Sequence, residues 1–118
     1  MNEWIGTGRV QSEVKIVPTR NGGFFGKFVL KVPRRPGRRG SDFVHIRVSG
    51  WRLEVCRHMV QQGARLRITG PLHTYRSKES GQECAGYEIL ARKISFLDLE
   101  QNKKLFQEWG QEKWNRKQ

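Results

Sequence analysis

Aromatic and cationic side chains alternate with apolar ones in two neighbouring segments, Phe25 to Lys31 and Phe43 to Arg47. In a β-strand alternate side chains point to opposite faces, so each segment has one apolar face and one face of rings and cations. If the two strands pair side by side, their faces of rings and cations join into one exposed patch. This patch contains Phe25, Lys27, Lys31, Phe43, His45 and Arg47. Rings stack on unpaired bases at about 1–3 kcal/mol per base and cations neutralise phosphates, so the pattern predicts a surface for a nucleic-acid strand.

The competing interpretation is a solvated strand face on which two aromatic rings merely cover a hydrophobic edge. Exposed lysine on a strand is ordinary, so either segment taken alone fits both interpretations. The agreement between the two segments favours the nucleic-acid surface.

The segment that joins the two strands, Pro33 to Ser41, has two prolines, two glycines and no large apolar side chain. This composition predicts a mobile hairpin loop. Beside the stacking candidates, its arginines favour a flexible phosphate clamp over a merely solvated tip. The arginines are Arg34, Arg35, Arg38 and Arg39.

Further residues outside these strands are assigned to nucleic-acid binding. Trp51 and Tyr75 are additional stacking candidates, and Arg65 and Arg67 would add electrostatic attraction. Two alternatives stay open, because Trp51 also suits the core at the start of a helix and Tyr75 also suits packing at a barrel edge. Trp4 is assigned to packing or to a subunit contact.

The composition narrows the class of partner. The 118 residues suit one domain, and 23 Lys and Arg against 11 Asp and Glu give a formal net charge of +12. A field of this sign attracts polyanions, with nucleic acid the first candidate and a membrane surface the second. No apolar run reaches the roughly 18 residues that span a bilayer, and the N-terminus lacks the shape of a signal peptide. We expect a location in the cytoplasm with the nucleoid, or in a plastid if the gene is organellar.

No group of residues suggests catalysis. Cys56 and Cys84 lack metal-site spacing and are assigned to packing, and the three histidines fall on different predicted elements. The familiar hydrolase, metalloprotease and nucleotide-binding motifs do not occur. The sequence therefore predicts no enzyme, no cofactor and no metal site.

Hydrophobic periodicity and turn signals predict five strands with one short helix between the third and fourth. The strands are expected at 2–10 with an extension at 14–17, at 24–32, at 42–49, at about 66–75 and at about 86–96, and the helix at 51–62. Polar turns are expected at 18–23 and 77–82. This is the order of an OB-fold, a five-stranded Greek-key barrel whose second and third strands commonly face oligonucleotides.

The chain divides into an OB-fold domain at 1–98 and a basic helical tail at 99–118. An apolar stripe in the tail includes Leu99, Phe106 and Trp109. The stripe would either dock on the barrel or form a partner or subunit contact, and the sequence favours neither.

Over roughly residues 2–98 the chain resembles the bacterial single-stranded DNA-binding protein family, SSB. The resemblance rests on residues whose order and spacing match over most of the chain: Asn2, Gly8-Arg9, Asn21-Gly22-Gly23, Phe28-Val29-Leu30, Asp42-Phe43, Gly50, Leu53-Glu54, Gly63, Gly70, Thr74, Tyr87-Glu88-Ile89-Leu90-Ala91 and Phe96-Leu97. It implies an OB-fold that binds single strands by stacking and phosphate contacts in replication, recombination and repair, commonly as a homotetramer. Compact relatives with one domain include the dimeric primosomal replication protein N and cyanobacterial or plastid SSB-like proteins.

The resemblance places Phe43 at a stacking position and departs from the family pattern elsewhere. Ser49 stands where an aromatic residue is usual, Tyr75 lies near rather than at another such position, and the loop position that often holds tryptophan falls among arginines. Because arginines replace an aromatic ring at the loop position, we expect binding to depend steeply on salt and to discriminate weakly between single strands and other polyanions. The family's acidic tip is also absent from the sequence, which favours an accessory binder.

The leading hypothesis is therefore a binder of single-stranded DNA that takes part in replication, recombination or repair. An RNA target stays open. The second hypothesis is an OB-fold interaction module of a replication or ribonucleoprotein assembly. Expected partners are single-stranded DNA, further copies of the chain as a dimer or tetramer, and replication or repair proteins, but no membrane.

Overall fold

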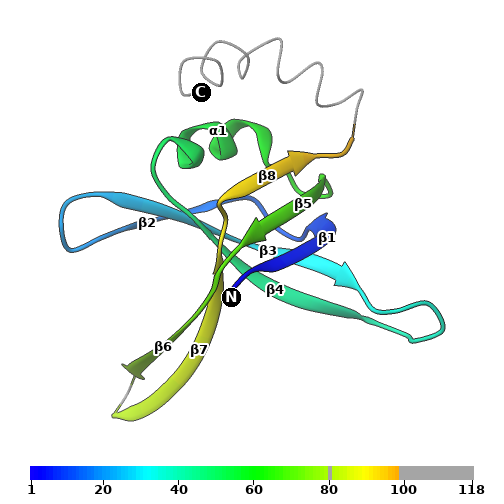
Figure 1. The fold of residues 1–118 in the computed structure, drawn as a ribbon. Helices are drawn as coiled ribbons and strands as arrows, with labels where there is room; N and C mark the ends of the chain where they lie inside the picture. Colours follow the sequence, from blue (N-terminus) through cyan, green and yellow to red (C-terminus); the bar gives the residue numbers. More distant parts are fainter. Residues whose placement is uncertain (80, 99–118) are drawn as a thin grey trace.

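The structure is a computed structural model that describes residues 1–79 and 81–98. Within these residues it has eight strands and one helix (Figure 1). In chain order they are β1 (Trp4–Val10), β2 (Lys15–Pro18), β3 (Phe24–Pro33), β4 (Ser41–Val48), α1 (Trp51–Met59), β5 (Arg65–Gly70), β6 (Leu72–Glu79), β7 (Gln82–Leu90) and β8 (Lys93–Phe96).

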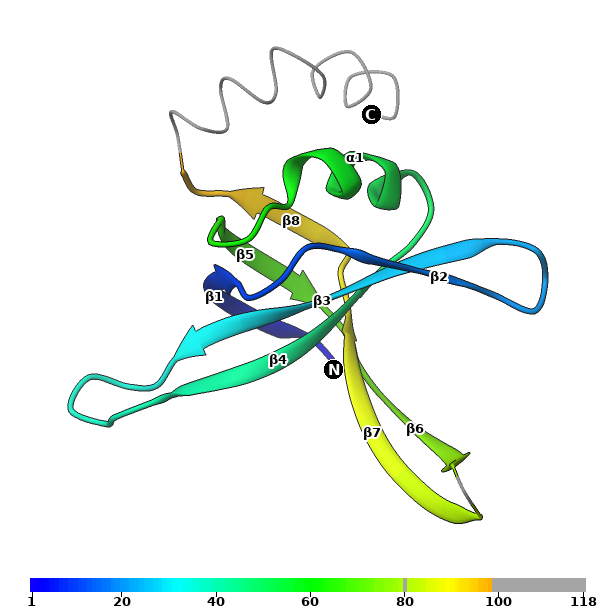
Figure 2. The same ribbon diagram turned by 180° about the vertical axis from the view of Figure 1, so that it is seen from behind.

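The strands form one sheet in the order β6-β7-β4-β3-β1-β5-β8, and β2 pairs with β3 outside this path. Every pair is antiparallel except β4 with β7, which run in parallel at Ile46–Ile89 and Arg47–Leu90. The sheet coils on itself, and the β2–β3, β3–β4 and β6–β7 hairpins project from it as three arms (Figures 1 and 2). Helix α1 lies at one end of the coiled sheet (Figure 2).

The predicted OB-fold is confirmed, with one helix between the third and fourth of its five long strands. Three of those strands are each broken in two. The first gives β1 and β2, the fourth breaks at Pro71 between β5 and β6, and the fifth breaks at Ala91 and Arg92 between β7 and β8. The two breaks in the fourth and fifth strands lie together, because the Leu90 N–H donates to the Pro71 carbonyl. They separate the projecting β6–β7 hairpin from the coiled part of the sheet.

Two predicted boundaries were wrong. The helix ends at Met59 rather than Gln62, because Val60 turns to an extended conformation (φ −86°, ψ 106°) that buries its side chain in the core. The turn expected at 77–82 is much shorter, because pairing continues to Glu79–Gln82. Gly81 supplies the positive φ of 77° that so tight a turn needs. The predicted tail helix at 99–118 lies outside the described residues.

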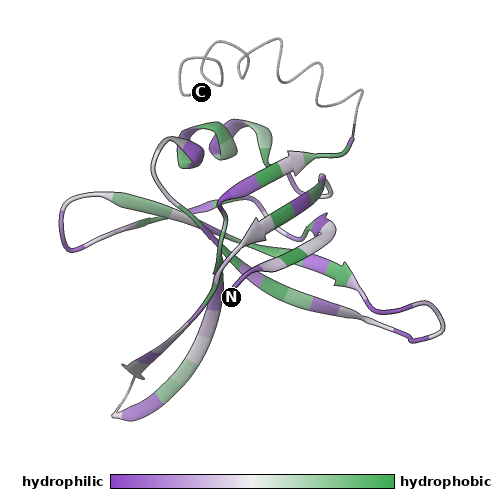
Figure 3. Ribbon diagram, viewed as in Figure 1, coloured by the Kyte–Doolittle hydropathy of each residue, from purple (hydrophilic) through white to green (hydrophobic). Residues whose placement is uncertain are grey.

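The core is built from the apolar rows of the strands. Phe28 and Leu30 from β3, Ile46 from β4 and Leu66 and Ile68 from β5 are buried together. Because alternate residues point outward, strands such as β4 show alternating bands of opposite hydropathy in Figure 3. The same alternation that fills the core therefore sets out a row of polar and aromatic side chains on the outer face.

The residues set aside at the sequence level have structural places. Trp4 packs against the core, and Cys56 is buried there as a free thiol whose pKa burial raises to about 12. Cys84 is also free but exposed on β7, so its assignment to packing was wrong. No helix in the described part of the chain is long and apolar enough to cross a membrane.

Candidate nucleic-acid interface

The register between β3 and β4 places the two predicted segments on one face. Lys27 lies opposite Arg47 and Lys31 lies opposite Phe43. Between these pairs, His45 lies opposite Val29. Opposed residues of an antiparallel pair share a face with Cβ atoms about 5 Å apart, so the predicted patch is continuous across the two strands.

Strand β2 extends this face with a cation that the sequence did not single out. Lys15 lies opposite Lys27, which makes Lys15, Lys27 and Arg47 one row across β2, β3 and β4. Directly opposed like charges destabilise a sheet. The row is therefore a concentration of positive charge that an anion would relieve.

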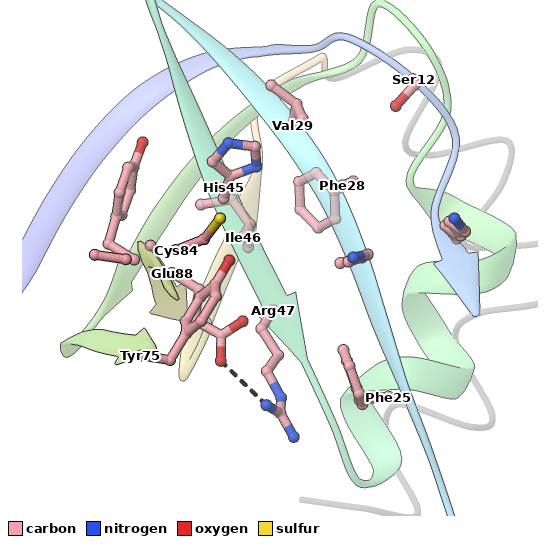
Figure 4. Close-up of a pocket in the computed structure, with 15 residues that line it drawn as sticks. Ser12, Phe25, Phe28, Val29, His45, Ile46, Arg47, Tyr75, Cys84 and Glu88 are labelled. Atoms are coloured by element: carbon pink, nitrogen blue, oxygen red, sulfur yellow. Dashed lines mark hydrogen bonds and ion pairs between the residues drawn. The ribbon is translucent and has the colours of Figure 1, made fainter. Parts of the chain in front are cut away.

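Arg47 is held in place by two neighbours. Its guanidinium carbon lies 3.9 Å from the centre of the Phe25 ring, and its Nη1 donates to Glu88 Oε1 at 3.1 Å. Figure 4 shows the Arg47 side chain reaching down between Phe25 and Glu88. Phe25 is half-buried and lies against Arg47, which limits the ring surface that it offers to a base.

The β6–β7 hairpin forms a second wall. Tyr75 lies opposite Gly86, and its ring covers that residue so closely that an added Cβ on Gly86 would approach the ring to 2.6 Å. Because glycine has no side chain, the ring can lie on the strand, with half of the residue's surface exposed. The glycine thus positions the tyrosine.

A groove of about 700 Å³ runs between the two walls. Figure 4 shows Phe25, His45 and Arg47 facing it from β3 and β4, and Tyr75 and Cys84 from the hairpin. It is lined by rings, cations and small residues: Ser12, Lys15, Phe25, Lys27, Phe28, Val29, His45, Ile46, Arg47, Tyr75, Cys84, Ala85, Gly86, Tyr87 and Glu88.

Tyr87 fastens the two walls together. Its hydroxyl donates to the Phe43 carbonyl at 3.0 Å, and its ring meets that of His45 edge-on with 5.6 Å between centres. Sequence reasoning took Tyr87 for an ordinary residue of the last strand and missed Glu88 as a partner. One signal could have revealed Glu88. Its carboxylate stands beside the apolar Ile89 and Leu90, where a partly buried charge needs an opposite charge, and Arg47 of the predicted patch could supply it.

The other predicted residues lie outside the groove. Lys31 and Phe43 continue the same face toward the loop at 33–41, with half of the Phe43 surface exposed. In that loop Arg34 pairs with Asp42 at 3.2 Å, which offsets its charge. The remaining loop arginines, Arg35, Arg38 and Arg39, are exposed.

Two further predictions have different outcomes. Arg65 and Arg67 lie on β5, which pairs with β1 and β8 and contributes nothing to the groove. Trp51 begins α1 as expected, but its side chain lies outside what the structure describes, so neither of its two roles is decided. Within 1–79 and 81–98 no group of three or more His, Cys, Asp or Glu could hold a metal ion.

The strand order, the helix between β4 and β5 and the groove over β3 and β4 define an OB-fold protein. The sequence matches the model of the Single-strand binding protein family over residues 1–97, and the chain belongs to this family.

One similar solved structure is the SSB complex of Plasmodium falciparum with ssDNA. It shares 24% sequence identity and a TM-score of 0.68 over 83% of this chain and 96% of that one. The likeness supports the assignment of the fold. A comparison with curated proteins finds no match.

Proposed function

We propose that this protein binds single-stranded DNA in the groove between the β3–β4 face and the β6–β7 hairpin. The observation that carries the proposal is the meeting of the exposed Tyr75 ring with a row of cations in one groove, with the exposed Phe43 ring just beyond it on the β3–β4 face. Membership of the Single-strand binding protein family supports it, as does the likeness to a structure solved with ssDNA.

Phe43 and Tyr75 are the stacking groups in this proposal. They expose 51% and 50% of their surface. Tyr75 lines the groove, and Phe43 lies just beyond it where the β3–β4 face continues, so a strand that runs along the groove can meet one ring after the other. A stacked base contributes about 1–3 kcal/mol. Bases already stacked in a duplex cannot offer their faces to these rings, so the proposal includes a preference for single strands.

Lys15 and Lys27 are the principal phosphate partners. Each cation that neutralises a phosphate of a single strand contributes about −0.7 to the slope of log K against log salt. Arg47 contributes less, because Glu88 already neutralises it. Charge from the loop arginines adds to the slope, so binding weakens steeply with salt, which suits an accessory role in replication, recombination or repair better than permanent coating of DNA.

The test measures the anisotropy of a fluorescein-labelled oligonucleotide of about 15 deoxythymidines, within the site size of such folds. The matched duplex and the matched RNA serve as competitors. We expect Phe43→Ala and Tyr75→Ala each to weaken single-strand binding by about 1–3 kcal/mol, or about five- to 150-fold.

Phe24→Ala is the matched control. Phe24 is on the same strand as Phe25 and exposes 59% of its surface, but it points away from the groove. Its loss should leave the affinity within twofold of the wild type. Equal losses for all three variants, or equal binding of duplex and single strand, would refute the proposal. Tighter binding of the matched RNA would assign the groove to RNA.

A further inference from the structure

Strands β1, β5 and β8 present an outer face that takes no part in the groove. Its register rows are Ile5–Thr69–Lys93 and Thr7–Arg67–Ser95, followed by Arg9 opposite Arg65. These side chains point outward because the alternate positions, Leu66 and Ile68 among them, fill the core.

This outer face is strongly cationic. Arg9, Arg65, Arg67 and Lys93 are all exposed, and the hydroxyls of Thr7, Thr69 and Ser95 lie among them. The three strands contain no aspartate or glutamate. The acids that flank them are Glu3, before β1, and Asp98, after β8. The Asp98 carboxylate accepts a hydrogen bond from the backbone N–H of Arg65 at 2.9 Å.

Two directly opposed pairs on this surface have like charge. Arg9 faces Lys31 of β3 on one side and Arg65 of β5 on the other. Arg9 is anchored in this position, since its Nη1 donates to the Gly63 carbonyl at 2.9 Å. Directly opposed like charges destabilise a sheet, so a polyanion bound over this row would relieve their repulsion.

The row also joins the groove face without a gap. Phe43 faces Lys31, Lys31 faces Arg9, and Arg9 faces Arg65. At about 4.8 Å between strands, Lys31 and Arg65 are roughly 10 Å apart across the sheet. A strand that leaves the groove at Phe43 therefore meets cations continuously as it crosses β3, β1 and β5.

We propose that the outer face of β1, β5 and β8 is a second track for the sugar–phosphate backbone of the same DNA strand. The inference rests on the proposed function, because the strand reaches this face from the groove. Trp4 and Phe96 point inward and no ring lies on the track, so it binds phosphates and hydroxyls without regard to base. It adds affinity only for strands longer than the groove.

The test compares the double variant Arg65→Gln and Arg67→Gln with the wild type on oligonucleotides of about 6 and about 25 deoxythymidines, with DNA in excess so that one protein binds each strand. Arg57→Glu is the control, because it lowers the net charge by the same two units at an exposed position on α1, outside both tracks.

We expect the double variant to bind the short oligonucleotide like the wild type. On the long one its salt slope should fall by about 1.4 in magnitude, which is about a 25-fold loss at 0.1 M salt. Arg57→Glu should cause a much smaller change in the salt slope. It should also cause a much smaller change in the difference in affinity between the short and the long oligonucleotide.

Equal affinity of the double variant and the wild type for the long strand would overturn the second track. So would an equal loss on both lengths, or a change of sedimentation coefficient that assigns the face to a contact between copies. Failure of the wild type to bind the short strand would instead refute the proposed groove function, so the two failures can be told apart.

Discussion

Replacing Glu88 by glutamine should destabilise the free protein and yet raise its affinity for single-stranded DNA. Glu88 neutralises Arg47 at 3.1 Å, and their side chains are only 19% and 35% exposed. Glutamine keeps an oxygen that accepts from the guanidinium but removes the charge. Arg47 is then left facing Lys27 with no carboxylate beside it.

The two effects have calculable sizes. A partly buried, charge-assisted hydrogen bond and a newly unrelieved like-charge pair each involve about 1 kcal/mol, so the free energy of unfolding should fall by about 1–2 kcal/mol. In the complex, Arg47 becomes available to a phosphate and the salt slope steepens by about 0.7. If the variant and the wild type bind equally at about 1 M salt, a slope steeper by about 0.7 gives the variant about a fivefold higher affinity at about 0.1 M salt.

The assay combines urea unfolding with anisotropy titrations at four salt concentrations between about 0.05 and 0.4 M, roughly the range in which such slopes are linear. Glu83→Gln is the matched control on the same strand. Glu83 pairs with Arg76, but both side chains are largely exposed and neither lines the groove, so stability should change little. A Glu88→Gln protein that bound more weakly, or with an unchanged slope, would refute the placing of Arg47 on a phosphate.

Three further predictions follow from the same geometry. Replacing Lys15 and Lys27 together by glutamine should lower the salt slope by about 1.4 in magnitude, and titrations at several salt concentrations measure this directly. Gly86→Ala should push the Tyr75 ring off its strand and weaken binding, but should have no effect in a Tyr75→Ala background, which a double-mutant cycle checks. A thiol reagent should modify Cys84 and spare Cys56 in the folded protein, and bound oligonucleotide should slow the reaction, because Cys84 lines the groove.

The pH dependence of stability follows from the buried thiol. Burial raises the pKa of Cys56 from 9.0 to about 12, so above pH 9 the unfolded chain loses this proton while the folded chain keeps it. The stability that the buried thiol contributes is therefore complete below pH 9 and is lost as the pH rises toward 12. Urea unfolding of the wild type should show this decline, and Cys56→Ala should lack this part of it.

The fold was predictable because its signals are local. Alternation of Phe28 and Leu30 with lysines marked β3, and glycines marked its turns, so the strands and the OB order could be derived from spacing alone. The breaks at Pro71 and Ala91 were less visible, since they depend on a hydrogen bond between two distant strands.

The candidate site could be predicted only in part. Residues on adjacent strands, such as Lys27 and Arg47, follow from simple pairing. The position of the second wall could not be predicted in this way. It depends on a parallel pairing between β4 and β7 that involves only two residue pairs and has no local sequence signal. Tyr87 and Glu88 were missed for this reason. The same limit applies to Arg65 and Arg67, because their place on a face away from the groove depends on the pairing of β5 with β1 and β8.

The most direct test of the central claim is photo-cross-linking with a short strand of about 6 nucleotides containing 5-iododeoxyuridine, followed by digestion and mass spectrometry. Binding in the groove predicts adducts on Tyr75, which lines the groove, and on Phe43, where the β3–β4 face continues beyond it, and the loss of both when unlabelled single strand competes. Adducts confined to α1 or to β5, with none on the β4 and β6 peptides, would contradict the account.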